Sequence, residues 1–239
     1  MTERLPVNGT AAQLEAGDAY GAFATLLRDC YWHAPIGAVD DARLARLLAT
    51  FGRPWSPEHA VATVAPRSRP RFAADTREAI PAHNECAYTE RPPRLLALYC
   101  VANDSDGGAF FAIPGERLVA RLGERYLPSL RGARYACRMS DAAPAFETAL
   151  LRPTPTGERL VYTAVAAMGG GSAYTLVRAA DACSAELLTR VRGLVDDPSL
   201  RHRHRWRAGD LLVLDNLRLL HGREAFGAGE RVLRHVRIA

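Results

Sequence analysis

The spacing of apolar residues divides the chain into a helical N-terminal part and a longer part built from short strands. Residues 11–30 and 40–51 carry apolar side chains at helical spacing, and Gly52 and Pro54 end the second run. From about residue 60 the pattern changes to short apolar runs separated by turn residues. These runs are residues 60–66, 94–102, 109–114, 133–139, 159–165, 211–216, 217–223 and 231–239, with one further helical run at 184–195. Helices followed by many short strands predict an α+β chain with a mainly β core, a barrel or sandwich, and flanking helices in about residues 1–55.

No composition break or linker divides the 239 residues, so we expect a single domain spanning residues 1–239. Hydrophobic residues make up 48% of the chain, enough for a sizeable core. No apolar run approaches the roughly 18 residues that a membrane helix needs, and the start lacks a secretory signal pattern. The five cysteines are scattered and form no CxxC pair, which indicates free thiols. Together these features predict a cytoplasmic protein without a membrane partner.

The net charge of +5 comes from arginine, since the chain contains no lysine. This bias, with the abundance of alanine, is typical of a GC-rich genome. The densest basic run, residues 201–207, leads into an apolar strand and contains a single aromatic residue, Trp206. It is therefore predicted to be a solvated loop and strand entry, with no nucleic acid as partner.

The candidate chemistry begins at His83 and Glu85. On a strand, two side chains two residues apart leave the same face, so the imidazole and carboxylate would lie together. Alone, this triplet is a weak signal. His221, at the end of a late apolar run, could complete the two-histidine, one-carboxylate set that binds iron(II) and leaves coordination positions open.

The last apolar run adds a second candidate, Arg231. On a strand, Arg231, Leu233, His235 and Arg237 share one face. An arginine at the floor of a barrel can bind a carboxylate through two parallel hydrogen bonds. Such an arginine would suit 2-oxoglutarate as a ligand. This molecule chelates iron through its keto-acid end, and its far carboxylate must be neutralised inside an apolar cavity.

These residues lie in motifs that resemble the taurine dioxygenase and clavaminate synthase-like branch of the iron(II)/2-oxoglutarate oxygenases. The resemblance covers about residues 45–239 and has three specific parts. His-x-Glu is followed by a tyrosine and a Pro-Pro pair within residues 83–93, a Gly-Gly turn lies at 107–108, and residues 206–232 contain W-x-x-G-D, D-N, H-x-R and R-V. The resemblance implies a double-stranded β-helix, or jelly roll, flanked by helices.

The resemblance also implies roles for individual residues. His83, Glu85 and His221 would bind Fe(II), and Arg231 would bind the far carboxylate of 2-oxoglutarate. Arg234 or Arg237 would be the alternative clamp.

Two positions depart from the family pattern. Phe110 stands where many relatives have a threonine that touches 2-oxoglutarate, and His235 stands where some have an arginine for an acidic substrate group. His235 and Arg234 are therefore the candidate substrate contacts. The glycine-rich segment 168–173 could cover the pocket or be an ordinary surface loop.

The carboxylate ligand bears on the reaction. Halogenases of the superfamily carry glycine or alanine at that position, so Glu85 implies hydroxylation or desaturation with O2. A glutamate in this place resembles members that act on free or carrier-bound amino acids. The expected substrate is a small molecule, an amino acid or an amino-acid-derived intermediate of specialised metabolism.

Two alternatives from other classes remain at this stage. One is a metal-dependent hydrolase or isomerase that uses the same three ligands, and the other is a non-catalytic jelly-roll binding protein. Arg231 separates them from the oxygenase, because only 2-oxoglutarate chemistry requires the clamp. The sequence carries no signal for an oligomeric state.

Overall fold

The computed structural model describes residues 4–56, 61–70, 72–137, 144–154, 157–164 and 174–239. The glycine-rich segment 168–173 lies outside the described residues.

The N-terminal part folds into three short helices. They are α1 (Ala11–Glu15), α2 (Ala19–Asp29) and α3 (Asp41–Leu48). The single helix predicted over 11–30 is divided because the side chain of Asp18 accepts a hydrogen bond from the backbone of Gly21 and so starts α2. Asp40 caps α3 in the same way, through the backbone N–H of Arg43.

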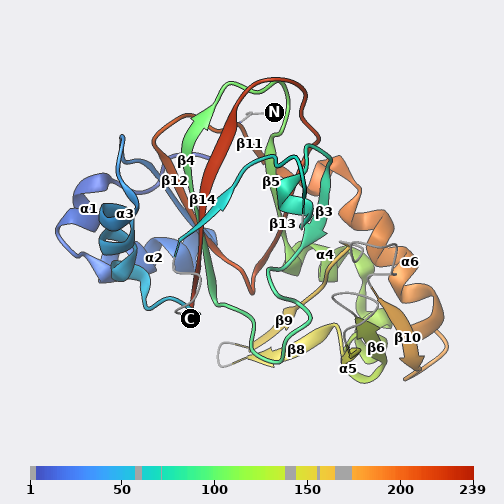
Figure 1. The fold of residues 1–239 in the computed structure, drawn as a ribbon. Helices are drawn as coiled ribbons and strands as arrows, with labels where there is room; N and C mark the ends of the chain where they lie inside the picture. Colours follow the sequence, from blue (N-terminus) through green and yellow to red (C-terminus); the bar gives the residue numbers. More distant parts are fainter. Residues whose placement is uncertain (1–3, 57–60, 71, 138–143, 155–156, 165–173) are drawn as a thin grey trace.

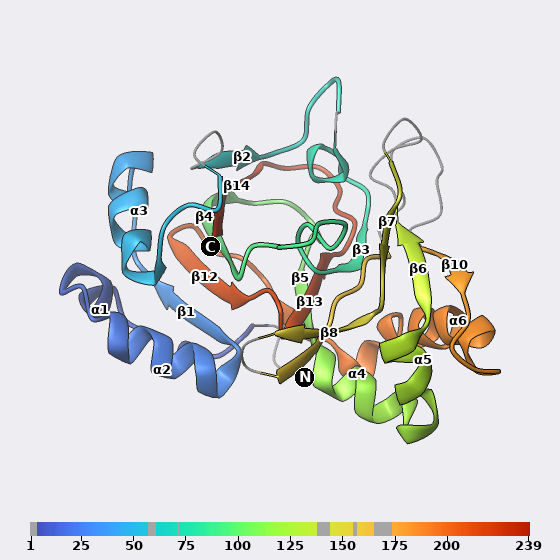
Figure 2. The ribbon, with the colours of Figure 1, turned by 90° about the horizontal axis from the view of Figure 1, so that it is seen from below.

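The centre of the molecule consists of two antiparallel sheets. The five-stranded sheet has the order β1-β12-β4-β14-β2, and the four-stranded sheet has the order β11-β5-β13-β3. The strands of the first are β1 (Tyr31–Pro35), β2 (Ala62–Val64), β4 (Leu95–Asn103), β12 (Asp210–Asp215) and β14 (Arg231–Ile238). Those of the second are β3 (Ile80–His83), β5 (Phe110–Pro114), β11 (His202–His204) and β13 (Leu219–Arg223). Figure 2 shows the two sheets around a common interior, with β4, β12 and β14 on one side and β3, β5 and β13 on the other.

The remaining elements form a second lobe beyond the four-stranded sheet. Its helices are α4 (Gly115–Leu122), α5 (Leu127–Gly132) and α6 (Ser184–Val195). Its strands form a sheet of β10 (Thr175–Arg178), β6 (Arg134–Cys137) and β7 (Phe146–Thr148), and a pair of β8 (Leu151–Thr154) and β9 (Gly157–Leu160). Short 3-10 turns occur at Ala49–Phe51, Ala73–Asp75, Glu124–Tyr126 and Pro198–Leu200.

The described residues form three apolar cores, and the side chains of each central strand alternate between the two cores on either side of its sheet. On β4, Leu96 and Leu98 face the interior between the two sheets, whereas Leu95 and Ala97 face the N-terminal helices. The outer side of the four-stranded sheet packs against α4, α5 and α6. Figure 1 shows the resulting order of helices, sheet, sheet and helices across the molecule.

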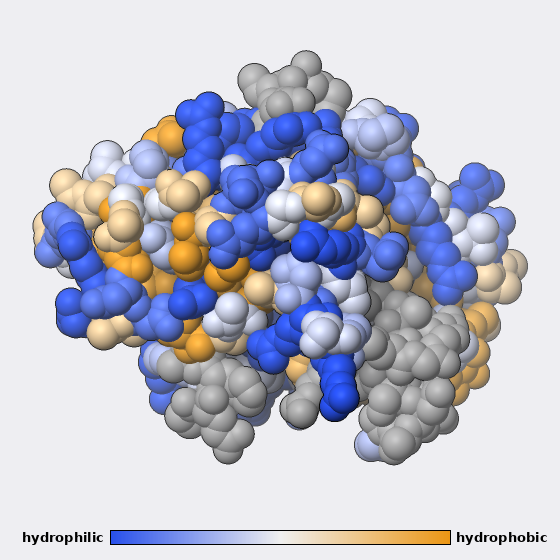
Figure 3. Space-filling view, turned by 45° about the horizontal axis from the view of Figure 1, so that its top comes forward, coloured by the Kyte–Doolittle hydropathy of each residue, from blue (hydrophilic) through white to orange (hydrophobic). Residues whose placement is uncertain are grey.

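The surface follows from this layering. The face in Figure 3 is largely hydrophilic, and its apolar patches lie mainly on the side of α1–α3. The longest described helix, α6, has 12 residues, and no helix of the described chain is both long and apolar enough to cross a bilayer.

Candidate metal centre and cosubstrate site

The two candidate histidine ligands lie side by side on neighbouring strands. His83 ends β3 and is the Cα partner of His221 on β13, and their ring centroids are 4.3 Å apart. Gly222 allows this close pairing, since a Cβ there would lie 2.5 Å from the carbonyl oxygen of Ile80 on β3. Pairing between these strands therefore brings together two residues that are far apart in the sequence.

Glu85 reaches the same place by a different route from the one predicted. It lies in the turn that follows β3 and not on the strand itself. The Asn216 side chain holds this turn: Oδ1 accepts from the Glu85 N–H at 2.7 Å, and Nδ2 donates to the Glu85 carbonyl at 3.1 Å. Asn84 holds its other side by donating to the Leu219 carbonyl at 3.1 Å. The carboxylate is thus positioned by two buried asparagines.

The donor atoms of this triad suit a divalent cation. His83 Nδ1 donates to the Pro81 carbonyl at 2.9 Å, so Nε2 is the nitrogen that faces the triad, 3.8 Å from Glu85 Oε2. One donor atom from each of His83, Glu85 and His221 lies within 4.8 Å of the others. Two imidazoles and one carboxylate form the donor set that binds iron(II) and keeps positions open for small ligands.

The electrostatics of the triad favour the ligating forms. Burial, and then the neighbouring His83, hold the pKa of His221 well below its usual value, so the ring is neutral at pH 7. Burial would raise the pKa of Glu85, but His83, His235 and Arg237 outweigh burial and hold it well below the usual range. Glu85 is therefore ionised at neutral pH.

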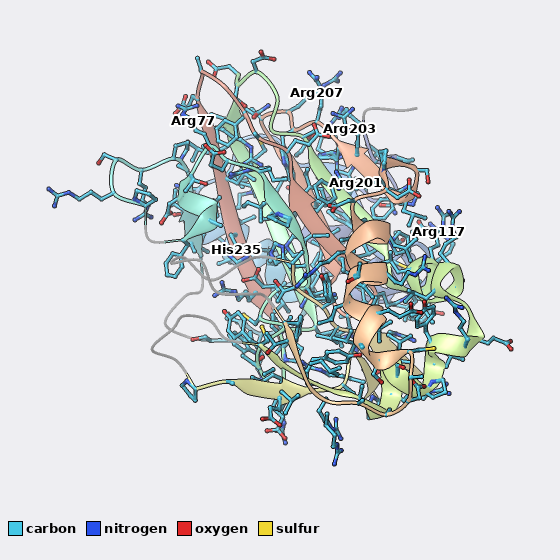
Figure 4. All side chains as sticks on the ribbon, turned by 90° about the vertical axis from the view of Figure 1, so that its right-hand side faces the viewer. Arg77, Arg117, Arg201, Arg203, Arg207 and His235 are labelled. Carbon is cyan, nitrogen blue, oxygen red and sulfur yellow. The ribbon has the colours of Figure 1, made fainter. Side chains whose placement is uncertain are left out.

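Arg237 binds the oxygen of Glu85 that faces away from His83. Its Nε and Nη2 atoms lie 2.6 and 2.5 Å from Glu85 Oε1, and His235 Nε2 lies 3.8 Å from the same oxygen. Figure 4 shows His235 among the strands, whereas Arg203 and Arg207 of the basic run lie toward the upper edge. Arg237 and His235 thus occupy the inner face of β14, as the alternation predicted, and Arg237 orients the Glu85 carboxylate.

Arg234 is not brought to the site. It lies on the opposite face of β14, where its Nε donates to Asp41 Oδ1 at 2.6 Å and its Nη1 to Thr63 Oγ1 at 3.1 Å. Strand alternation sends residue 234 toward the helices, so the structure removes it both as a substrate contact and as a clamp.

Replacing Arg237 with glutamine is expected to weaken metal binding about tenfold, because partners that orient a metal ligand typically contribute 10- to 100-fold in affinity. Mn²⁺, a stand-in that does not oxidise, can be titrated and followed by its EPR signal. Arg234→Gln is the matched control, because it removes the same charge from the outer face of the same strand. Equal affinities for the two variants would contradict the orienting role of Arg237.

Arg231 has the properties of a buried anion-binding residue. It is 3% exposed, and among the described residues its guanidinium has no hydrogen-bond or ion-pair partner. Burial, and then the charge of nearby Arg223, lower its pKa to about 10, so it stays charged at neutral pH. A buried cation without a partner is costly, and a bound carboxylate would offset that cost.

The surroundings of Arg231 add to its positive field. The guanidinium carbons of Arg77, Arg223 and Arg231 lie 5.3, 4.8 and 5.4 Å from the centroid of the Phe226 ring. The Gly-Gly turn at 107–108 packs against Phe226, and a Cβ at its second position would lie 3.0 Å from the Phe226 Cβ. The turn motif therefore supports the ring on which the arginines stack.

The spacing along β14 suits a five-carbon diacid. Arg231 and His235 share the inner face and are four residues apart, roughly 13 Å at about 3.3 Å per residue. A ligand that starts at the triad beside His235 would meet the long side chain of Arg231 near its far end.

Phe110 provides apolar surface where the family pattern has a threonine that touches 2-oxoglutarate. Its ring stacks on His221 at 5.9 Å with an interplanar angle of 19° and meets Trp206 at 5.9 Å. Because Phe110 is 3% exposed, it covers one side of the metal ligands with apolar surface.

Three functional contacts were missed by sequence reasoning. They are the asparagine clamp of Asn84 and Asn216, the Arg237–Glu85 pair, and Arg223 beside Arg231. Asn84 lies between the two ligands in His-Asn-Glu and Arg223 lies in His-x-Arg, so both were visible. Nothing local in the sequence shows that their side chains reach these partners.

Comparison with known proteins is consistent with this geometry. Residues 24–238 match the family model described as "Taurine catabolism dioxygenase TauD, TfdA family". Tyrosine isonitrile desaturase from Pseudomonas aeruginosa is 31% identical over 176 residues, which is 66% of this chain and 57% of that protein's length.

Solved structures show the same fold. The PvcB protein of Pseudomonas aeruginosa superposes with a TM-score of 0.72 at 24% identity, covering 93% of this chain and 81% of the other. A taurine dioxygenase from Burkholderia xenovorans gives a TM-score of 0.69 at 19% identity, covering 92% and 80%.

Proposed function

The chain belongs to the taurine catabolism dioxygenase TauD, TfdA family, and we propose that it uses iron(II), 2-oxoglutarate and O2 to hydroxylate or desaturate a small molecule. The observation that carries the proposal is Arg231, a buried guanidinium without a hydrogen-bond or ion-pair partner among the described residues, on the inner face of the strand that reaches the triad. A hydrolase or isomerase with the same three ligands has no use for this charge. A binding protein has no need for a metal centre with open positions.

In this proposal each described side chain of the site has its own role. His83, Glu85 and His221 hold the metal, and Arg231 binds the far carboxylate of 2-oxoglutarate. When bound, iron(II) and 2-oxoglutarate would supply the chemistry that activates O2, the oxidant, and 2-oxoglutarate would leave as succinate and carbon dioxide. The protein positions these groups and excludes water through the apolar interior to which Phe110 belongs.

We propose further that the two facing sheets form a double-stranded β-helix within one domain. All of their strand pairings are antiparallel, and the apolar core between them continues from one sheet to the other. The triad and Arg231 open into that interior.

The substrate class we propose is an amino acid or an amino-acid-derived molecule. Support comes from the similarity to a tyrosine isonitrile desaturase and to structures of an asparagine oxygenase, at 18% identity and a TM-score of 0.72. Inside the site, His235 replaces the family's arginine and faces the interior beside Glu85. An imidazole offers a single hydrogen bond where the family's arginine offers two parallel ones, which favours a polar group over a sulfonate or a second carboxylate.

A two-stage experiment tests the proposed function. Anaerobic addition of iron(II) and 2-oxoglutarate should produce a weak visible charge-transfer band, which neither alternative class predicts. Succinate formation is then measured across a panel of free and N-modified amino acids, and the substrate should raise it well above the rate without substrate. Absence of the band at saturating iron and 2-oxoglutarate would refute the oxygenase assignment.

A further inference from the structure

A second cluster of two histidines and a carboxylate lies inside the barrel, away from the triad. His33 is on β1, His204 is on β11, and Asp210 begins β12. Their strand partners Leu212 and Phe110 belong to the core between the sheets, so His33 and His204 point into the interior. Asp210 is the aspartate of the W-x-x-G-D motif, but the proposed oxygenase chemistry gives this cluster no role.

The geometry of the second cluster matches that of the first. The Nε2 atoms of His33 and His204 each lie 3.7 Å from an oxygen of Asp210, and one donor atom of each residue lies within 4.8 Å of the others. In the first triad, the corresponding separation between His83 and Glu85 is 3.8 Å. The three side chains are more deeply buried here, with His33 and His204 at 0% exposure and Asp210 at 1%.

The imidazoles of this cluster have ring nitrogens that make no hydrogen bond with the described residues. Both ring nitrogens of His204 are buried without a hydrogen-bond partner, and so is Nε2 of His33. The other nitrogen of His33, Nδ1, donates to the carbonyl of Pro6 at 3.3 Å, so Nε2 is the nitrogen that faces Asp210. Burial, and then His33, lower the pKa of His204 to about 3, so its ring is neutral and able to act as a ligand.

The cluster spans the seam between the two sheets. Strand β1 is an edge strand of the five-stranded sheet and β11 is an edge strand of the four-stranded sheet. No backbone ladder joins these two edges in the described chain. A cation held by His33, His204 and Asp210 would tie the two edges together.

We propose that His33, His204 and Asp210 form a second, structural site for a divalent metal of the zinc class, which fastens β1 to β11. Two imidazoles and one carboxylate are ligands that Zn²⁺ accepts, with water in the fourth position, and the complete burial of the three side chains distinguishes this cluster from the first triad. Strand spacings put His204 and His221 roughly 12 Å apart, two strands across and two residues along. The ring of Phe110 lies between them, against His221 on one side and Trp206 on the other.

Arg4 competes with the metal for Asp210. Its Nη2 lies 2.8 and 2.6 Å from the two carboxylate oxygens, which balances the charge of Asp210 in the metal-free chain. A bound cation would leave Arg4 with excess positive charge, so its side chain, 27% exposed, would move toward water. A pocket of about 240 Å³ lined by Arg4 and Trp206 offers room for this movement. Arginine on the ligand carboxylate occurs in both clusters, since Arg237 binds Glu85.

The test uses the 239-residue chain without a tag, in which His83→Ala and His221→Ala have removed two ligands of the first triad. After loading with zinc and desalting, metal analysis should find one zinc per chain, and zinc should raise the thermal unfolding midpoint. Adding His204→Gln should abolish both effects. Adding His202→Gln instead, which changes an exposed histidine of the same strand, should change neither. A parent variant that retains no zinc, or a His204→Gln variant that retains as much as its parent, would overturn the proposal.

A second variant keeps the proposal testable if His204→Gln does not fold by circular dichroism. Arg4→Ala removes the competitor, so zinc affinity measured against a chromophoric chelator should rise at least tenfold. Unchanged or weaker affinity would overturn the site as proposed. Because all these proteins lack the first triad, the outcome is independent of whether the chain is an oxygenase.

Discussion

Replacing His221 with alanine is expected to abolish iron retention and turnover while leaving the fold intact. His221 is one of three donor groups, and its Cα partner His83 supplies another, so the variant leaves only two protein ligands for the metal. The ring is 7% exposed at the end of a strand, and its removal leaves a small gap beside Phe110 that costs stability but not topology. Iron content after desalting, succinate formation and circular dichroism measure the three expectations.

The control for His221→Ala is His202→Ala. His202 lies on β11, shares the partner residue Ala112 with His221, and is exposed. Exposed substitutions usually change stability by no more than about 0.5 kcal/mol. If His221→Ala retains iron and turns over like the control, the assignment of the triad is wrong.

The ligands could be read from the sequence because each sits in a recognisable local motif. Their meeting depends on the pairing of β3 with β13, which the motif order suggested but periodicity alone could not show. The local geometry assumed for Glu85 was wrong. A long-range clamp, from Asn216 to a residue 131 positions earlier, holds it in a turn beyond the strand. Such a contact leaves no periodic trace in the sequence.

The pattern of apolar residues did not lead us to predict strand β1 or helices α4 and α5. Strand β1 follows α2 after one residue, because Cys30 adopts a left-handed backbone (φ 67°) that usually marks glycine. The strand carries His33 toward the interior where an apolar residue would normally alternate. Helices α4 and α5 are short, at 8 and 6 residues, and owe much of their stability to packing in the core that they share with α6.

The period-two alternation of side chains correctly predicts the inner face of β14. It places Arg231, His235 and Arg237 on one face, and the structure agrees. The same rule excludes Arg234, which pairs with Asp41 on the outside. Alternation cannot say which of the inward arginines has a partner within the protein. That distinction depends on the position of Glu85 beside Arg237.

The pairing of Arg237 leaves Arg231 as the free inward charge, and Arg231→Ala is expected to weaken the use of 2-oxoglutarate about a hundredfold. Leaving a buried carboxylate without its partner costs roughly 3 kcal/mol, and 1.4 kcal/mol corresponds to a tenfold change. The apparent KM for 2-oxoglutarate, measured by succinate release, should rise accordingly, whereas iron retention should not change.

A comparison of cosubstrates makes the test of Arg231 specific. A 2-oxo acid without the far carboxylate gains nothing from Arg231, so the preference of the wild type for 2-oxoglutarate over this monoacid should collapse in Arg231→Ala. Arg234→Ala, on the outer face of the same strand, should keep the wild-type preference. Arg223 also stacks on Phe226 and would be the remaining cation near the far carboxylate. An unchanged KM and an unchanged preference in Arg231→Ala would therefore move the clamp to Arg223, because Arg237 is already held by Glu85.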